Sequence, residues 1–172
     1  GNINNIIEAA EKTSFVMLNI EVYLVSIIAF YIMGNQRDVL YSAIKGYKLH
    51  NRFPGTMHHV FLITFSALTF AKCYNSQGFF KKILYRHRIK SIIKLLNQYQ
   101  KFSSINYSCH YYLISAELGR IENNSMLAMS LYGKAFKSAK SLNNSILIAI
   151  IHERLIEMYL ECEDDISATK HF

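Results

Sequence analysis

The amino-acid sequence predicts an all-α protein, a right-handed stack of antiparallel helical hairpins. Three observations lead to this fold class. The 172-residue chain is 51% hydrophobic and holds one proline and seven glycines, so long uninterrupted helices can form. Apolar residues recur at three- and four-residue spacing along most of the chain. Small residues at Ala116, Ala128 and Ala135 would let neighbouring helices approach closely, with Tyr132 filling the space between them.

The composition indicates the domain organisation, the charge of possible partners and the redox compartment of the protein. No low-complexity linker interrupts the sequence, and we expect residues 1–172 to form one helical-repeat domain. The net charge of +7 favours acidic partners without identifying them. The cysteines Cys73, Cys109 and Cys162 are far apart and odd in number, which predicts free buried thiols in a reducing, cytoplasmic setting.

Both ends of the sequence suggest a piece of a longer protein. The first residue is Gly1 rather than methionine. Near the other end, Asp164 and Asp165 should open a new helix, which Phe172 would stop after about two turns. We therefore expect the last hairpin of the stack to be truncated.

The first hairpin is expected at about residues 13–51. Thr13 or Ser14 should cap its first helix, because short hydroxyl side chains accept hydrogen bonds from exposed N–H groups at helix starts. That helix should run from Phe15 to Met33. The sequence Gly-Asn then ends it, and a return helix follows from Gln36 to Asn51.

The first helix of this hairpin is nearly all apolar, so a membrane span must be considered. Asn19 and Glu21 interrupt the apolar run. A spanning helix needs roughly 20 consecutive apolar residues, and the run after Glu21 is shorter than that. We therefore expect a helix buried on most sides within the stack, and no membrane span.

The second hairpin is expected at about residues 56–102. Pro54 and Gly55 form a loop before it, and helices should follow from His58 to Tyr74 and from Phe79 to Lys101. The second of these helices is strongly amphipathic. Its core stripe consists of Ile89, Ile92, Ile93 and Leu96.

The third and fourth hairpins are expected at about residues 107–142 and 145–172. Asn124 or Ser125 should cap the second helix of the third hairpin. First-helix side chains of these hairpins should line a concave groove whose carboxylates suit a basic peptide or a neighbouring domain. Alternatively, Arg120, Arg154 and Lys134 could pair locally with those acids. The groove candidates are His110, Leu113, Glu117, Arg120, Glu153 and Glu157.

A basic helix face is the strongest charge feature. It could bind RNA, an acidic lipid or an acidic protein segment. We favour an ordinary solvated helix face instead. Membrane binding would also need a large exposed apolar face, which the stack should consume. The basic-face residues are Lys81, Lys82, Arg86, Arg88, Lys90 and Lys94.

Few residues suggest chemistry. Adjacent His58 and His59 point about 100° apart on a helix and cannot easily share a metal ion. Cys109 and His110 would need mutual contact and an orienting third group to form a nucleophile. The sequence therefore predicts no catalytic residue, no cofactor and no metal site.

Several stretches carry a family resemblance. Ala128, Tyr132 and Ala135 have the spacing of the second helix of a tetratricopeptide repeat, and aligning Ala168 with Ala128 gives a period of 168 − 128 = 40 residues, longer than the usual ~34. The segments 24–56, 61–102 and 110–141 resemble the tetratricopeptide-like helical region of very large signalling proteins. Those proteins carry kinase-like, AAA-type ATPase and GAF domains and often a histidine kinase, as in fungal hybrid histidine kinases.

The resemblance implies a tetratricopeptide-like superhelix of about four hairpins. It also implies a non-catalytic scaffold that couples neighbouring domains in stress signalling, with protein as the partner. None of the catalytic motifs of that family lies in this chain. A basic module that binds RNA or another polyanion is the alternative function, although no polar code residues repeat from hairpin to hairpin.

Overall fold

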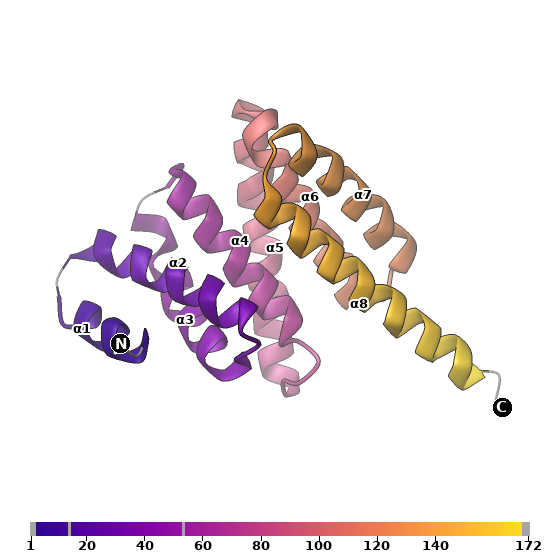
Figure 1. Ribbon diagram of the computed structural model, residues 1–172, viewed down its shortest axis with the longest axis horizontal. Helices are drawn as coiled ribbons and strands as arrows, with labels where there is room; N and C mark the ends of the chain where they lie inside the picture. Colours follow the sequence, from indigo (N-terminus) through magenta and orange to yellow (C-terminus); the bar gives the residue numbers. More distant parts are fainter. Residues whose placement is uncertain (1–2, 14, 53, 170–172) are drawn as a thin grey trace. The chain divides into compact units, whose positions relative to one another are not determined.

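The computed structural model describes residues 3–13, 15–52 and 54–169. Within these residues the chain forms α-helices and one short 3₁₀ helix, without a β-strand (Figure 1). The predicted all-α class is therefore confirmed. The finer prediction, a right-handed tetratricopeptide-like stack of hairpins, stays a prediction.

The chain divides into two compact units, Gly1–Lys94 and Leu95–Phe172. The division falls inside the long helix α5 (Phe79–Phe102). The expectation of one domain over residues 1–172 stays a prediction.

The first unit contains α1 to α4 and residues 79–94 of α5. Helices α2, α3 and α4 pack against one another, and α1 packs on α2 (Figure 1). The helix bounds are α1 Ile3–Glu11, α2 Val16–Ile32, α3 Gln36–Leu49, the 3₁₀ helix His50–Arg52 and α4 Met57–Lys72. The most deeply buried apolar side chains of this unit include Ile27, Val60, Leu62, Ile63 and Leu68.

Helix α2 is buried or half-buried on most sides, as its apolar sequence predicts, and is exposed along one side. Ile20 and Ile27 are buried, whereas Val25, Ile32 and Met33 are exposed. Among the described residues, no helix combines the length and apolarity that crossing a membrane requires.

Side-chain caps fix several helix starts. Asn35, Thr56, Asn124 and Asn144 each accept a hydrogen bond from the backbone N–H three residues later. The predicted cap at Asn124 is thereby confirmed. The predicted cap at Thr13 is wrong, because its hydroxyl donates to the carbonyl of Ala10 and closes α1 instead. Ser14 lies outside the described residues.

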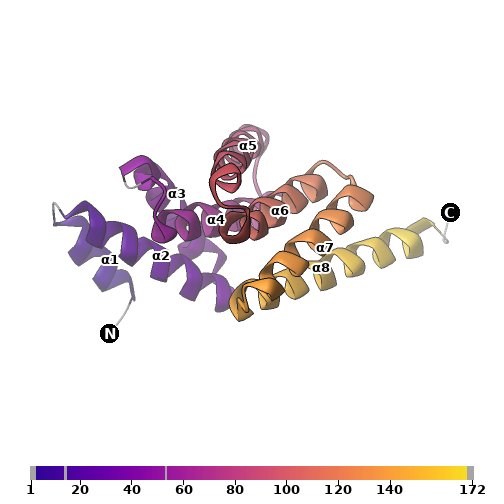
Figure 2. The same cartoon turned by 90° about the horizontal axis from the view of Figure 1, so that it is seen from above.

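The second unit contains the rest of α5 and helices α6 (Ser104–Ile121), α7 (Ser125–Ser141) and α8 (Ser145–Thr169). Helix α7 packs against both α6 and α8, and Figure 2 shows α7 and α8 side by side. Ala116, Ala128 and Ala135 are fully buried, as their small size predicted. A Cβ on Gly119 would lie 3.3 Å from the backbone nitrogen of Ala128, so α6 and α7 are in close contact there.

The expected start of a new helix at Asp164 is wrong, because Asp164 lies inside helix α8. This helix continues without interruption from Ser145 to Thr169. Residues 155–163 contain neither glycine nor proline, so nothing breaks the helix before the two aspartates. The expected ends at Gly1 and Phe172 lie outside the described residues.

Candidate functional site

A buried ionic cluster joins the three helices of the second unit. Glu117 on α6 is 1% exposed, and its carboxylate accepts hydrogen bonds from two neighbouring helices. The hydroxyl of Tyr132 on α7 donates to Oε1 at 2.5 Å. Arg154 on α8 donates from Nε to Oε1 at 2.7 Å and from Nη2 to Oε2 at 2.8 Å. This two-bond pairing fixes the position of α8 against α6.

The electrostatics of Glu117 keep it ionised. Burial acts to raise the pKa of this carboxyl group, but the charge and hydrogen bonds of Arg154 oppose it, with help from Arg120 and Tyr132. The net result is a pKa below the ordinary value. Burial and the adjacent Glu117 carboxylate raise the pKa of Tyr132, so its hydroxyl stays a donor. The cluster is therefore a closed structural ion pair.

The cluster continues towards the surface through Arg120. Its Nη2 atom donates to Oε1 of Glu161 at 2.8 Å and lies 3.8 Å from Oε2 of Glu157. Arg154 also pairs with Glu157. The alternative that arginines pair locally with the groove acids is confirmed for Arg120 and Arg154. Lys134 lies over the ring of Tyr112, with Nζ 5.7 Å from the ring centroid.

The predicted groove is wrong for three of its six residues. His110, Leu113 and Glu117 are at most 1% exposed, so they cannot line an open surface. The reason is that α7 and α8 cover this face of α6, and the carboxylate is matched by arginine rather than by water. Of the remaining groove candidates, Arg120, Glu153 and Glu157 are partly exposed.

The predicted basic face lies on α5 and is largely exposed. Lys81, Arg86, Lys90 and Lys94 are exposed, and Lys82 is half-buried with its Nζ 5.5 Å from the ring centroid of Tyr74. Arg88 departs from this pattern. Its guanidinium carbon lies 5.3 Å from the ring centroids of both Tyr47 and Phe70, so Arg88 packs between helices.

Large apolar side chains lie beside the basic residues and are exposed, contrary to the expectation that the stack would bury the apolar face that membrane binding needs. Phe79, Phe80, Ile83 and Leu84 are all exposed at the start of α5. Beside them is a shallow groove of about 430 Å³ within the first unit. Its lining residues are Tyr74, Phe79, Lys82, Ile83, Arg86, His87 and Lys90.

A sequence signal for this surface lies in the distribution of carboxylates. Between Asp38 and Glu117 the sequence contains no aspartate or glutamate. The same stretch contains eleven lysines and arginines, including every residue of the predicted basic face. Counting net charge over the whole chain conceals this separation of positive and negative residues.

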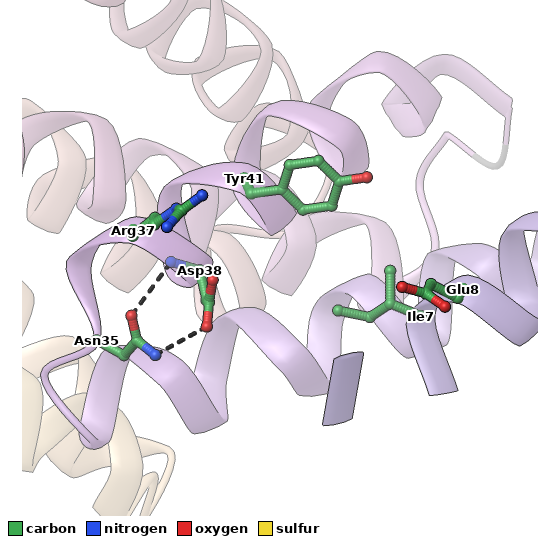
Figure 3. A pocket seen from close by; sticks show the side chains of 6 residues that line it. All are labelled: Ile7, Glu8, Asn35, Arg37, Asp38 and Tyr41. Carbon is green, nitrogen blue, oxygen red and sulfur yellow. Dashed lines mark hydrogen bonds between the residues drawn. The ribbon is translucent and has the colours of Figure 1, made fainter. Parts of the chain in front are cut away.

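A pocket of about 590 Å³ lies in the first unit beside the start of α3 (Figure 3). Asn35 donates from Nδ2 to Oδ2 of Asp38 at 2.9 Å and accepts from the Asp38 backbone N–H at 3.3 Å. These bonds are a helix cap, which explains the two polar groups without a ligand. The pocket is lined by Ile7, Glu8, Asn35, Arg37, Asp38 and Tyr41.

The histidines and cysteines occupy packing positions. Burial raises the pKa of the Cys109 thiol to about 12 and lowers the pKa of His110 to about 4. A protonated thiol is a poor nucleophile, so the geometry does not favour a Cys–His pair. His59 is buried and accepts a hydrogen bond from the Gly55 N–H at 3.3 Å, whereas neighbouring His58 is exposed. Among the described residues, no His, Cys, Asp and Glu side chains group as metal ligands.

A second exposed apolar surface lies on α7 and α8 in the second unit. Met126, Ile156 and Leu160 are 88%, 60% and 56% exposed. The Tyr159 hydroxyl lies 3.9 Å from the Met129 sulfur, which places these two exposed side chains on the same side of the helix pair. We call Met126, Met129, Ile156, Tyr159 and Leu160 the α7/α8 face. Sequence reasoning missed it, because helical spacing alone does not tell which apolar stripe has a covering helix.

Comparison with known proteins gives no relative for this chain. No family model, curated protein or solved structure matches it. The resemblance to the helical region of multidomain signalling proteins therefore stays a prediction.

Proposed function

We propose that this chain is a non-catalytic helical-repeat region that binds protein. The partner is either another domain of a multidomain sensor kinase or signalling ATPase, or a separate signalling protein. The single observation that carries the proposal is the α7/α8 face, where five large apolar side chains are exposed on two neighbouring helices. Exposed apolar patches of this kind mark interaction sites in soluble proteins.

The spacing within this face suggests the shape of the partner. Tyr159 and Leu160 follow Ile156 by three and four residues, so the three side chains lie on the same side of α8. Met126 and Met129 are three residues apart on α7, and methionine adapts readily to different partner surfaces. An amphipathic helix laid along the two helices would bury all five side chains.

Replacing Ile156 and Leu160 with lysine tests the proposal. Both side chains are exposed, so the double variant should keep its helical content and melting temperature. The wild-type chain should enrich specific proteins from an extract of the source cells, and the variant should lose them. Each enriched protein is then purified, and its dissociation constant should rise by at least about tenfold in the variant.

The matched control replaces Val25 and Ile32 of α2 with lysine. These side chains are similarly exposed but lie in the other unit. Equal loss of binding in the control would contradict a specific role for the α7/α8 face. ATP hydrolysis by the purified chain would contradict the non-catalytic part of the proposal.

Polyanion binding is a second candidate function, supported by a different observation. The exposed cations of α5 lie in a stretch of sequence without carboxylates. RNA binding through these residues should weaken steeply as salt rises, because phosphate contacts release counterions. Affinity that does not change between low and moderate salt would exclude this mechanism.

A further inference from the structure

The first two turns of α5 combine exposed apolar side chains with cations. Phe79 and Phe80 are 71% and 84% exposed, and Ile83 and Leu84 are 53% and 44% exposed. The two phenylalanine rings contact each other edge to face at 5.7 Å between centroids. This exposed set lies at the end of the α4–α5 connection in the first unit, where residues 73–78 join the two helices.

Cations flank this apolar set. Successive residues of a helix are about 100° apart, so Lys81 and Lys82 lie on opposite sides of the face that carries Phe80 and Ile83. Arg86 and Lys90 follow in the next turns and line the groove beside Tyr74. Long basic side chains at such positions can reach a charged plane while the apolar residues between them enter a less polar layer.

We propose that the start of α5 binds the surface of a membrane that contains anionic lipids. Phe79, Phe80, Ile83 and Leu84 enter the boundary between headgroups and acyl chains. Lys81, Lys82, Arg86 and Lys90 contact the phosphate and carboxylate groups of the lipids. Amphipathic helices with aromatic and basic residues bind membrane surfaces by this combination of burial and charge attraction.

The geometry favours a membrane over an acidic protein segment. Phe79 and Ile83 line the groove, whereas Phe80 and Leu84 do not. One peptide helix in the groove would therefore leave two of the four apolar side chains exposed. A planar interface covers the whole end of a helix at once.

The side-chain types favour a membrane over RNA. Aliphatic Ile83 and Leu84 offer neither a stacking ring nor a hydrogen bond to a nucleotide. Both can be buried among acyl chains. Charge complementarity supports the same partner, because the sequence from Val39 to Ala116 has no carboxylate to repel an anionic surface.

Vesicle binding of the full chain tests the proposal. The chain should sediment with phosphatidylcholine vesicles that contain phosphatidylserine, and only weakly with phosphatidylcholine alone. Phe79→Ser with Phe80→Ser, and separately Lys82→Glu with Arg86→Glu, should each lower the vesicle partition coefficient by about tenfold or more. Undiminished binding in both double variants would overturn the proposal.

Controls separate this site from general surface properties. Lys137→Glu with Lys140→Glu makes the same charge change on exposed positions of α7. Ile32→Ser with Met33→Ser removes equally exposed apolar side chains from the end of α2. Both controls should bind vesicles as the wild type does, and a comparable loss in either would overturn the assignment to α5.

A fluorescent reporter distinguishes membrane insertion from binding of another polyanion. The chain has no tryptophan, so Phe80→Trp introduces a single indole at an exposed position. Its emission should shift to shorter wavelength with anionic vesicles, and brominated lipids should quench it. Binding to single-stranded RNA without either vesicle response would overturn the proposal in favour of nucleic acid.

Discussion

At the scale of single residues, small side chains decide how closely helices approach. Gly119 on α6 faces the backbone of Ala128 on α7, and a Cβ there would lie 3.3 Å from a backbone nitrogen that cannot rotate away. The sequence predicted this close contact correctly from Ala128 and its neighbours. Helical spacing and residue size are local properties, so they can be read without knowing the partner helix.

Gly119→Ala should destabilise the protein despite the higher helix propensity of alanine. The added methyl group forces α6 and α7 apart, at a cost of about 1–3 kcal/mol. Gly133→Ala on α7 is the matched control, because a Cβ there meets nothing within 4 Å. It should instead stabilise the protein by about 0.5–1 kcal/mol. Urea unfolding of both variants checks the prediction, and equal effects would show that the contact is not tight.

His110 should make stability depend on pH. Burial lowers its pKa to about 4 in the folded protein, whereas an unfolded histidine has a pKa of ~6.5. Because the unfolded chain binds the proton more tightly, the contribution of His110 is full above that unfolded value. It is then lost as pH falls towards the folded value. His59 behaves similarly, with burial lowering its pKa to about 4.

The measurement that checks this is the change in the free energy of unfolding per pH unit between about pH 5 and about pH 6. His110→Gln should reduce this slope by up to about 1.4 kcal/mol per pH unit, leaving the share of His59. An unchanged slope would mean that His110 is protonated in the fold. Glu117 does not interfere, because its lowered pKa places its own loss of stability at more acidic pH.

At the scale of helices, the ion pair between Glu117 and Arg154 joins α6 to α8. Sequence reasoning named Arg154 as a local partner but placed Glu117 in an open groove. The amphipathic pattern of a helix assigns charged residues to its surface. Only the folded structure shows that Glu117 is buried and that Arg154 neutralises its charge. The uninterrupted α8 was missed for a related reason, because two aspartates resemble a helix start but do not break a helix.

Glu117→Ala should cost about 3–5 kcal/mol, because it removes the buried carboxylate that accepts two hydrogen bonds from the buried Arg154. Arg154→Leu should cost a similar amount. The double variant should cost much less than the sum, and a double-mutant cycle by urea unfolding measures this coupling. Strict additivity would contradict a direct pair.

Glu11 is a more exposed carboxylate, and its contribution to stability can be compared with that of the buried Glu117. Glu11 at the end of α1 accepts hydrogen bonds from Tyr23 at 2.5 Å, from Lys45 at 3.0 Å and from Tyr41 at 3.1 Å. Lys45 is 39% exposed in its side chain, so solvent screens the pair. Glu11→Ala should cost only about 0–1 kcal/mol. A loss as large as that of Glu117→Ala would show that exposure does not set the difference.

At the scale of the whole molecule, composition and periodicity were sufficient for the all-α class. They did not reveal the division at Lys94, because α5 continues through it without a break in the sequence pattern. They also missed both exposed apolar surfaces, at the start of α5 and on the α7/α8 face. Whether an apolar stripe is covered depends on segments distant in sequence, which periodicity does not encode.

The most direct test of an interaction role is the affinity of a purified partner for the wild-type chain and for the Ile156→Lys, Leu160→Lys variant. Binding at the α7/α8 face predicts a dissociation constant at least about tenfold higher in the variant, with the α2 control unchanged. Equal affinities for all three proteins would show that the α7/α8 face is not the site.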